Sequence, residues 1–190
     1  MLISSVLFGL VLAMLRRGDL RRLSLIKFRL WWLIVASFAL KLAIIRFSSD
    51  GVDWMITYGP ALHLVAYVML LFPLLLNRDL PWMKLALLGT GLNFAVTAAN
   101  GGQMPVFEDT LVLMGKFESL ARLQVTTDAT HTIASASTAL AWLGDWIPIP
   151  LPLSAVVSPG DIFLALAVIL FTNTVTQPSY QYRPRPGLAS

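Results

Sequence analysis

The sequence predicts an all-α fold, a polytopic helical membrane bundle of about five transmembrane helices with an extracytoplasmic loop. Hydrophobic residues make up 57% of the 190-residue chain and charged residues only 13%, whereas globular proteins carry about a quarter charged residues. The apolar residues also come in long blocks between short charged clusters, as in multi-pass membrane proteins. We therefore expect a single integral membrane domain over residues 1–177.

The apolar blocks place the spans in order along the chain, at residues 2–15, 30–47, 58–76, 82–100 and 159–176. The first block is shorter than the roughly 17 to 25 residues of an ordinary span. It crosses the membrane if the bilayer thins locally or if Arg16 and Arg17 extend to the interface; otherwise four spans remain, with the loops on the same sides. The last block starts with Pro159, a residue favoured in the first turn of a helix.

The long connection between the last two blocks, residues 101–158, is expected to form an outer loop with two parts. Residues 106–123 alternate charged and apolar residues at helical spacing, which predicts an amphipathic helix. Residues 144–153 (GDWIPIPLPL) alternate proline with aliphatic residues. Proline favours extended backbone, so this part predicts a rigid Pro-rich strap over the bundle and not a span.

The distribution of positive charge predicts the orientation of the chain. Most of the 14 Lys and Arg residues fall on one side when segments 16–29, 77–84 and the tail 178–190 are placed there. The positive-inside rule makes that side cytoplasmic. The C-terminal tail is then cytoplasmic and disordered, the long loop is extracytoplasmic, and the N-terminus is extracytoplasmic if the first block spans. The net charge of +4 is thus a topology signal, and no nucleic-acid partner is expected.

A polar stripe runs along the fourth block, formed by Thr90, Asn93, Thr97 and Asn100 and continued by Gln103. Spacings of three and four residues put these side chains on one helical face. One interpretation is a polar ligand-binding cavity in the outer half of the bundle, since amides both donate and accept hydrogen bonds. The alternative is interhelical adhesion at about 0.6 to 2 kcal/mol per bond, with Asn100 capping the helix and Gly101 in the left-handed conformation.

His63 in the third predicted span and Lys41 in the second are ionisable residues well inside the span, away from its ends. Lys41 lies about 9 Å of helical rise from the predicted helix end at Phe47. Ionisable groups at membrane depth are functional candidates, and the two residues could form a protonatable or anion-attracting pair near the stripe. The alternative is a hydrogen-bonded histidine and a lysine that extends outward to the interface.

A second set of polar residues falls on the predicted outer side: Asp128, His131, Asp145 and Asp161. Such residues can bind metals or perform acid–base chemistry, but none of their spacings matches a recognised ligand pattern, so no metal is predicted. Asp128 and His131 could share a helical face. Structural roles are also open, with Asp145 capping a turn and Asp161 stabilising the positive end of a helix dipole.

The composition excludes several kinds of chemistry and leaves the partners open. The chain has no cysteine, which excludes disulfides, thiolate catalysis and iron–sulfur ligation. No motif indicates a cofactor. The expected partners are membrane lipids and either a second copy of the chain or a partner membrane subunit. All six tryptophans lie near predicted interfaces, as in an aromatic belt.

Three motifs resemble a known pattern: NFAVTAANGGQMPV at 93–106, LGDWIPIP at 143–150 and SPGDIFLALAVIL at 158–170. They are similar to an uncharacterised family of small bacterial multi-pass membrane proteins, a domain of unknown function. The pattern of that family is close to N-x-x-V-x-x-A-N-G-G-x-M-P-V, L-G-D-x-I-P-x-P and G-D. The resemblance covers most of the chain. It implies a multi-pass fold in a bacterial plasma membrane and no established activity.

Three classes of function remain. The first is binding or transport of a small polar solute or lipid headgroup, using Asn93, Thr97, Asn100, Gln103, His63 and Lys41. The second is an accessory or assembly subunit of a membrane complex, which predicts an exposed apolar face without a closed cavity. The third is a membrane-embedded enzyme that uses His131 with Asp128 or Asp145. The third class has the least chemical equipment.

Overall fold

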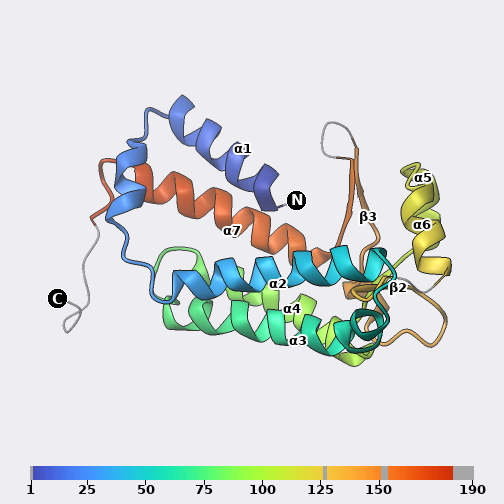
Figure 1. The fold of residues 1–190 in the computed structure, drawn as a ribbon. Helices are drawn as coiled ribbons and strands as arrows, with labels where there is room; N and C mark the ends of the chain where they lie inside the picture. Colours follow the sequence, from blue (N-terminus) through green and yellow to red (C-terminus); the bar gives the residue numbers. More distant parts are fainter. Residues whose placement is uncertain (1, 126–127, 151–153, 182–190) are drawn as a thin grey trace.

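A computed structural model describes residues 2–125, 128–150 and 154–181. The fold is mostly helical, with five longer helices that run roughly along one direction (Figure 1). They are α1 (Leu2–Leu15), α2 (Trp31–Ser49), α3 (Asp53–Leu76), α4 (Met83–Ala99) and α7 (Pro159–Thr176). Three of them, α2, α3 and α7, are long and apolar enough to cross a membrane, and α4 is a shorter apolar helix.

The helices pack as a curved row, in the order α2, α3, α4, α7 and α1. Each helix packs on its neighbours in this row, whereas α2 and α7 barely touch each other. A core of Leu74, Met83, Ala86 and Ala167 joins α3, α4 and α7. Close approach of α4 and α7 depends on two glycines, because a Cβ on Gly89 would lie 2.5 Å from the Gly160 carbonyl oxygen. This arrangement leaves space between α2 and α7.

The helix bounds agree well with the apolar blocks. Helices α1 and α7 have the same bounds as predicted, and α2 and α4 differ from the prediction by one or two residues at each end. Helix α3 begins at Asp53 instead of residue 58, because Met55 joins a buried cluster with Ile44 and Ala129. A 3₁₀ helix, η1 (Leu20–Leu25), follows α1. Of the predicted tail, residues 182–190 lie outside the described part.

The segment between α4 and α7, residues 104–157, is here called the cap segment, and it lies at one end of the bundle (Figure 1). It corrects the all-α expectation, because it contains short strands. Strand β1 (Met104–Val106) pairs in parallel with β2 (His131–Ile133), and β3 (Ile147–Ile149) pairs antiparallel with β4 (Ala155–Val157). A short 3₁₀ helix, η2 (Ala141–Leu143), precedes β3.

The predicted amphipathic helix over 106–123 is interrupted. It consists of α5 (Glu108–Leu113) and α6 (Phe117–Gln124), and Val106 belongs to β1 instead. The break falls at Gly115, whose φ of 64° is the left-handed conformation that ends helices and favours glycine. Leu111 and Leu123 nevertheless form one buried cluster with Val106, so the apolar faces of both helices pack against β1.

The predicted Pro-rich strap over 144–153 is instead one arm of a hairpin, since Ile147–Ile149 pairs with Ala155–Val157; residues 151–153 lie outside the described part. Pro148 is opposite Val156 in this pairing. Only alternate pairs of an antiparallel ladder exchange hydrogen bonds, so a proline without an N–H can occupy the position between two bonded pairs. The extended backbone was predictable from the prolines, but its partner strand was not.

Candidate functional site

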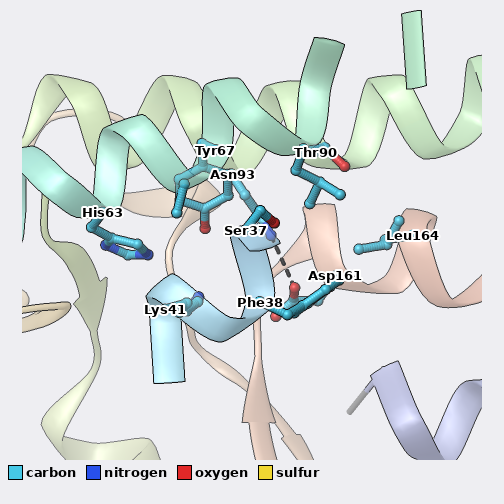
Figure 2. A pocket seen from close by; sticks show the side chains of 11 residues that line it. Ser37, Phe38, Lys41, His63, Tyr67, Thr90, Asn93, Asp161 and Leu164 are labelled. Carbon is cyan, nitrogen blue, oxygen red and sulfur yellow. Dashed lines mark hydrogen bonds between the residues drawn. The ribbon is translucent and has the colours of Figure 1, made fainter. Parts of the chain in front are cut away.

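A polar cavity of about 100 Å³ lies between α2 and α7, with α3 and α4 behind it (Figure 2). Its polar lining consists chiefly of Ser37, Lys41, His63, Thr90, Asn93 and Asp161. Four of these, Lys41, His63, Asn93 and Asp161, are sequence-predicted site residues. They come from four different helices, so the fold brings together residues as far apart in the sequence as Lys41 and Asp161, which are 120 positions apart.

His63 is fully buried and is oriented by the turn after α4. Its Nδ1 lies 2.9 Å from the Gly102 carbonyl oxygen. A carbonyl only accepts hydrogen bonds, so Nδ1 carries the proton and Nε2 carries the lone pair. Nε2 is buried and has no hydrogen-bond partner among the described residues. His63 therefore lines the cavity with one unsatisfied nitrogen.

The turn that holds His63 requires glycine at one position. Gly102 has a φ of +93°, and a Cβ on it would collide with the Pro60 carbonyl group. Its N–H donates to the Thr97 carbonyl at 2.9 Å, so this N–H belongs to the helix end and is not free to bind an anion. The Asn-Gly-Gly sequence thus brings the backbone close enough to α3 to fix the histidine.

Lys41 lies over the face of Tyr67, with its Nζ 5.5 Å from the ring centroid. The same ring stacks at a tilt against His63, with 5.0 Å between the centroids. Within the described ranges no carboxylate lies within ion-pair distance of Lys41. Its ammonium lines the polar cavity, whereas the sequence left open that it extends outward.

Asn93 links α4 to the start of α7. Its Oδ1 accepts from the Ser158 hydroxyl at 2.8 Å, and its Nδ2 donates to Asp161 Oδ1 at 2.9 Å. Ser158 and Asp161 also form a capping box at the start of α7. A Cβ on Gly160 would overlap Asn93 Oδ1, so the amide is closely enclosed. Asp161 has the predicted position in the first turn of α7 and one additional role, as the partner of Asn93.

Thr97, Asn100 and Gln103 do not line the cavity, and each bonds to the cap end. Thr97 donates to the sulfur of Met104 at 3.5 Å. Asn100 bonds to Val96 O and to both backbone groups of Ala139, and it ends α4 before Gly101 at a φ of 68°. Gln103 donates to the carbonyl oxygens of Asp128 and His131. Their geometry is that of adhesion and capping; ligand binding by them stays a prediction.

Thr90 is the exception in the stripe. Its side chain lines the polar cavity, and its buried Oγ1 has no partner among the described residues. The residues that sequence reasoning missed are Ser37 and Tyr67. Each lies four positions from a predicted site residue on the same helix, Ser37 before Lys41 and Tyr67 after His63, and this spacing puts the pair on one face. That spacing was the available signal.

An apolar groove of about 190 Å³ continues from the polar cavity along α2 and α7, and the two share Phe38, Leu70 and Leu164. The rest of its lining is also apolar and includes Phe28, Val168 and Phe171. The sequence did not predict this groove, because any apolar face in the bundle would have looked the same. It exists because α2 and α7 do not close on each other.

The second predicted set, Asp128, His131 and Asp145, comes together in the cap segment at a separate place. Here it lines a pocket of about 350 Å³, called the cap pocket, together with Lys116, Ser119 and Arg122. Asp128 lies just before β2 and His131 is the first residue of β2, so the two meet at the start of a strand and not on a helix. His131 Nε2 lies 3.9 Å from Asp145 Oδ2. No His, Asp or Glu cluster of metal-binding type occurs among the described residues.

The two carboxylates beside His131 have opposite environments. Burial raises the pKa of Asp128, but hydrogen bonds and the charge of His131, with the hydrogen bonds of Thr130, hold it well below its usual range. Asp145 lacks such donors, and burial raises its pKa from 3.8 to about 7, which the positive charge of His131 opposes. Asp145 does not cap a turn: its Oδ1 has no partner in the described part of the chain.

Comparison with known proteins places the chain in a family. Residues 25–173 match a family of unknown function (DUF5317). The chain belongs to this family. The matched range contains every residue of the polar cavity and the cap pocket and begins after α1.

An uncharacterised protein of Thermotoga maritima is 36% identical to this chain over 125 residues. The match covers 63% of this chain and 66% of the relative, just under two thirds of the relative's own length. No solved structure matches the chain.

Proposed function

We propose that the protein is an integral membrane protein that binds a membrane amphiphile with an acidic headgroup, through the cavity between α2 and α7. The observation that carries this proposal is the continuity of a polar cavity with an apolar groove, through the shared residues Phe38, Leu70 and Leu164. An acidic headgroup occupies the polar end and an acyl or prenyl chain lies along the apolar end.

The membrane arrangement in this proposal has five spans, formed by α1, α2, α3, α4 and α7. Three are long enough by composition, and the charge distribution supports a cytoplasmic C-terminus and an extracytoplasmic cap segment in a bacterial plasma membrane. The tryptophans support it too, because all six are among the exposed large hydrophobic residues: Trp31, Trp32, Trp54, Trp82, Trp142 and Trp146.

The chain has no cysteine, so single cysteines test this arrangement cleanly. An impermeant maleimide should label Ser137→Cys in the cap segment of intact cells. It should label Ser24→Cys in η1 only after lysis. The reverse pattern would overturn the orientation.

The acidic headgroup is inferred from the groups that the cavity leaves unsatisfied. Among the described residues, the positively charged Lys41 has no carboxylate within ion-pair distance, and neither His63 Nε2 nor Thr90 Oγ1 has a hydrogen-bond partner. Buried polar groups normally have partners. A phosphate or carboxylate supplies acceptors to Lys41 and Thr90, and a protonated headgroup oxygen supplies a donor to His63.

The cavity also favours binding over the accessory-subunit class. That class predicts apolar faces without a closed cavity, whereas the polar lining here comes from four helices, with Ser37, His63, Thr90 and Asn93 buried and Lys41 and Asp161 half-buried. A partner subunit could still cover the exposed apolar side chains of the bundle, such as Val35 and Leu42 on α2, but this surface equally suits lipid.

The test is native mass spectrometry of the protein extracted gently in its own lipids. We expect a retained anionic lipid in the parent protein. Lys41→Gln should retain at least about tenfold less, since hydrogen bonds to charged groups contribute about 1.5 to 3 kcal/mol. Val168→Trp, which fills the apolar groove, should also lose it.

Matched controls come from the same helices. Arg46→Gln removes an exposed charge from α2 that pairs with Asp50, and Leu166→Trp adds bulk on an exposed position of α7; both should retain the lipid. Equal retention by Lys41→Gln and the parent would overturn the proposal. A lipid-free species that carries a second polypeptide would do so in favour of an accessory subunit.

A further inference from the structure

The cap pocket has no place in the proposed function and carries a separate set of charges. Most of its lining residues belong to α5, α6, β1, β2 and β4 or lie next to them in the sequence. These elements lie at one end of the bundle (Figure 1). Acidic residues come from the strand side and basic residues from the helix side. The volume of about 350 Å³ accommodates a small molecule.

The two carboxylates of the cap pocket differ in the hydrogen bonds that they accept. Asp128 Oδ1 accepts from Thr130 N and Thr130 Oγ1 at 2.8 Å and from His131 N at 3.0 Å. These three bonds, all to Oδ1, hold the turn before β2. Asp145 is only 8% exposed, and its Oδ1 has no partner among the described residues.

Two hydrogen bonds fix the backbone of Asp145 next to β1. Its N–H donates to Pro105 O at 2.8 Å, and its carbonyl accepts from Phe107 N at 3.0 Å, which makes a bridge to Val106 beside β1. These bonds fix the backbone position from which the carboxylate lines the pocket. A buried carboxylate without donors is costly unless a cation or donor meets it.

His131 stands beside this carboxylate at a distance that leaves room. Its Nδ1 lies 2.8 Å from Thr130 Oγ1, whose hydroxyl proton goes to Asp128, so the ring is fixed on one side. On the other side Nε2 and Asp145 Oδ2 are 3.9 Å apart, too far for a hydrogen bond. A ligand amine beside the two atoms can donate to both.

The opposite wall supplies the complementary charge. Lys116, directly before α6, is half-buried at the pocket, and no carboxylate lies within ion-pair distance of it in the described ranges. Arg122 on α6 lines the same pocket. An anion alone would meet Asp145, and a cation alone would meet Lys116, so a ligand with both charges fits this pocket best.

We propose that the cap pocket binds a small zwitterion, with its ammonium at Asp145 and His131 and its anionic group at Lys116 and Arg122. The ligand chemistry is a primary amine joined by a short linker to a phosphate or carboxylate. This chemistry occurs both in free solutes and in aminophospholipid headgroups. The site is distinct from the cavity between α2 and α7, and its proposal does not depend on that function.

The experiment is isothermal titration calorimetry of the full chain in phosphatidylcholine nanodiscs, with O-phosphoethanolamine as the probe. Inorganic phosphate and ethanolamine are titrated separately. We expect each of them to bind at least tenfold more weakly than phosphoethanolamine. Asp145→Asn and Lys116→Gln should each weaken phosphoethanolamine at least tenfold, whereas Glu118→Gln, an exposed charge change on α6, should not.

Three results would overturn the proposal: phosphate binding as tightly as phosphoethanolamine, no binding of the probe at millimolar concentration, or full affinity in both Asp145→Asn and Lys116→Gln. Nanodiscs that contain phosphatidylethanolamine identify the source of the ligand. If this lipid blocks the free probe, the site takes a headgroup; if the probe still binds, the site takes a free solute. Either result supports the pocket as a zwitterion site.

Discussion

Two groups of residues on the polar face of helix α4 differ in their hydrogen bonding. Both amide atoms of Asn93, which bonds to the start of α7, and of Asn100, which bonds to the cap segment, have hydrogen-bond partners. Thr90 Oγ1 on the same face has none among the described residues, and neither does His63 Nε2, which lines the same cavity. Sequence spacing alone does not separate these two groups. The bonded atoms hold the bundle together, and the atoms without partners are the ones to which the proposed ligand would bond.

The cap pocket repeats this contrast with two carboxylates. Asp128 is surrounded by donors from Thr130 and His131, whereas Asp145 Oδ1 has no donor. One acid therefore stabilises a turn, and the other carries an unmet demand. In both regions, residues of the same type differ in role according to whether their polar atoms have hydrogen-bond partners.

The largest expected effect comes from the stripe residues of α4 that have hydrogen-bond partners. Asn93→Leu with Thr97→Val should lower the free energy of unfolding by about 2 to 4 kcal/mol, because Ser158 and Asp161 lose a buried partner and Gly160 leaves no room for a larger side chain. Thermal unfolding in detergent measures this loss. Unchanged stability together with unchanged lipid retention would contradict both the adhesion role and the cavity role of the stripe.

A smaller effect, with a sign set by pH, is expected at Asp145. Its pKa is raised from 3.8 to about 7, so between these values the folded state holds a proton that the unfolded state has lost. Stability of the parent protein therefore falls as the pH rises from about 4 to 7. Asp145→Asn stays neutral and should gain a few degrees in Tm relative to the parent at pH 8, compared with pH 4.

Asp128 provides the control for this pH experiment. Its pKa is held below the usual range, so its ionised form stabilises the fold above the unfolded pKa of about 4. Asp128→Asn should lose stability relative to the parent at pH 8, the opposite of Asp145→Asn. Equal pH profiles for the two variants would remove the distinction between the two carboxylates.

The smallest expected effect on stability is at Thr90, the stripe residue whose hydroxyl has no partner among the described residues. Thr90→Val removes a buried hydroxyl that has no partner and keeps its shape, so the free energy of unfolding should change by less than about 0.5 kcal/mol. Retention of the anionic lipid should decrease nonetheless. A loss of stability as large as that of Asn93→Leu with Thr97→Val would show that Thr90 also holds helices together and does not serve a ligand.

The sequence predicted the helices better than the cap segment, for a physical reason. Long apolar blocks and local caps determine a helix, and α7 starts at Pro159 after its cap, Ser158, as expected. The strands depend on distant partners: Met104 pairs with His131, and Ile147 pairs with Val157. No local pattern specifies such pairing. The predicted helix over 106–123 was drawn through Gly115, where the structure breaks it.

The candidate site was predictable in part. The sequence indicated a polar face on α4 and grouped it with Lys41 and His63, and the structure places Asn93, Lys41 and His63 around one cavity. It could not distinguish Thr97, Asn100 and Gln103, which bond to the cap end, from Thr90, which does not. The apolar groove was invisible for another reason, because it arises from two helices that fail to meet.

The apolar groove between α2 and α7 determines how a ligand would reach the proposed site. A molecule that enters between two spans arrives from the bilayer and never passes through water. Its occupancy then depends on its mole fraction among the surrounding lipids and not on a concentration in the medium. Dilution of the cells would leave the site full, whereas a change in lipid synthesis would empty it. Under the proposed function, occupancy of the cavity therefore follows the composition of the surrounding membrane.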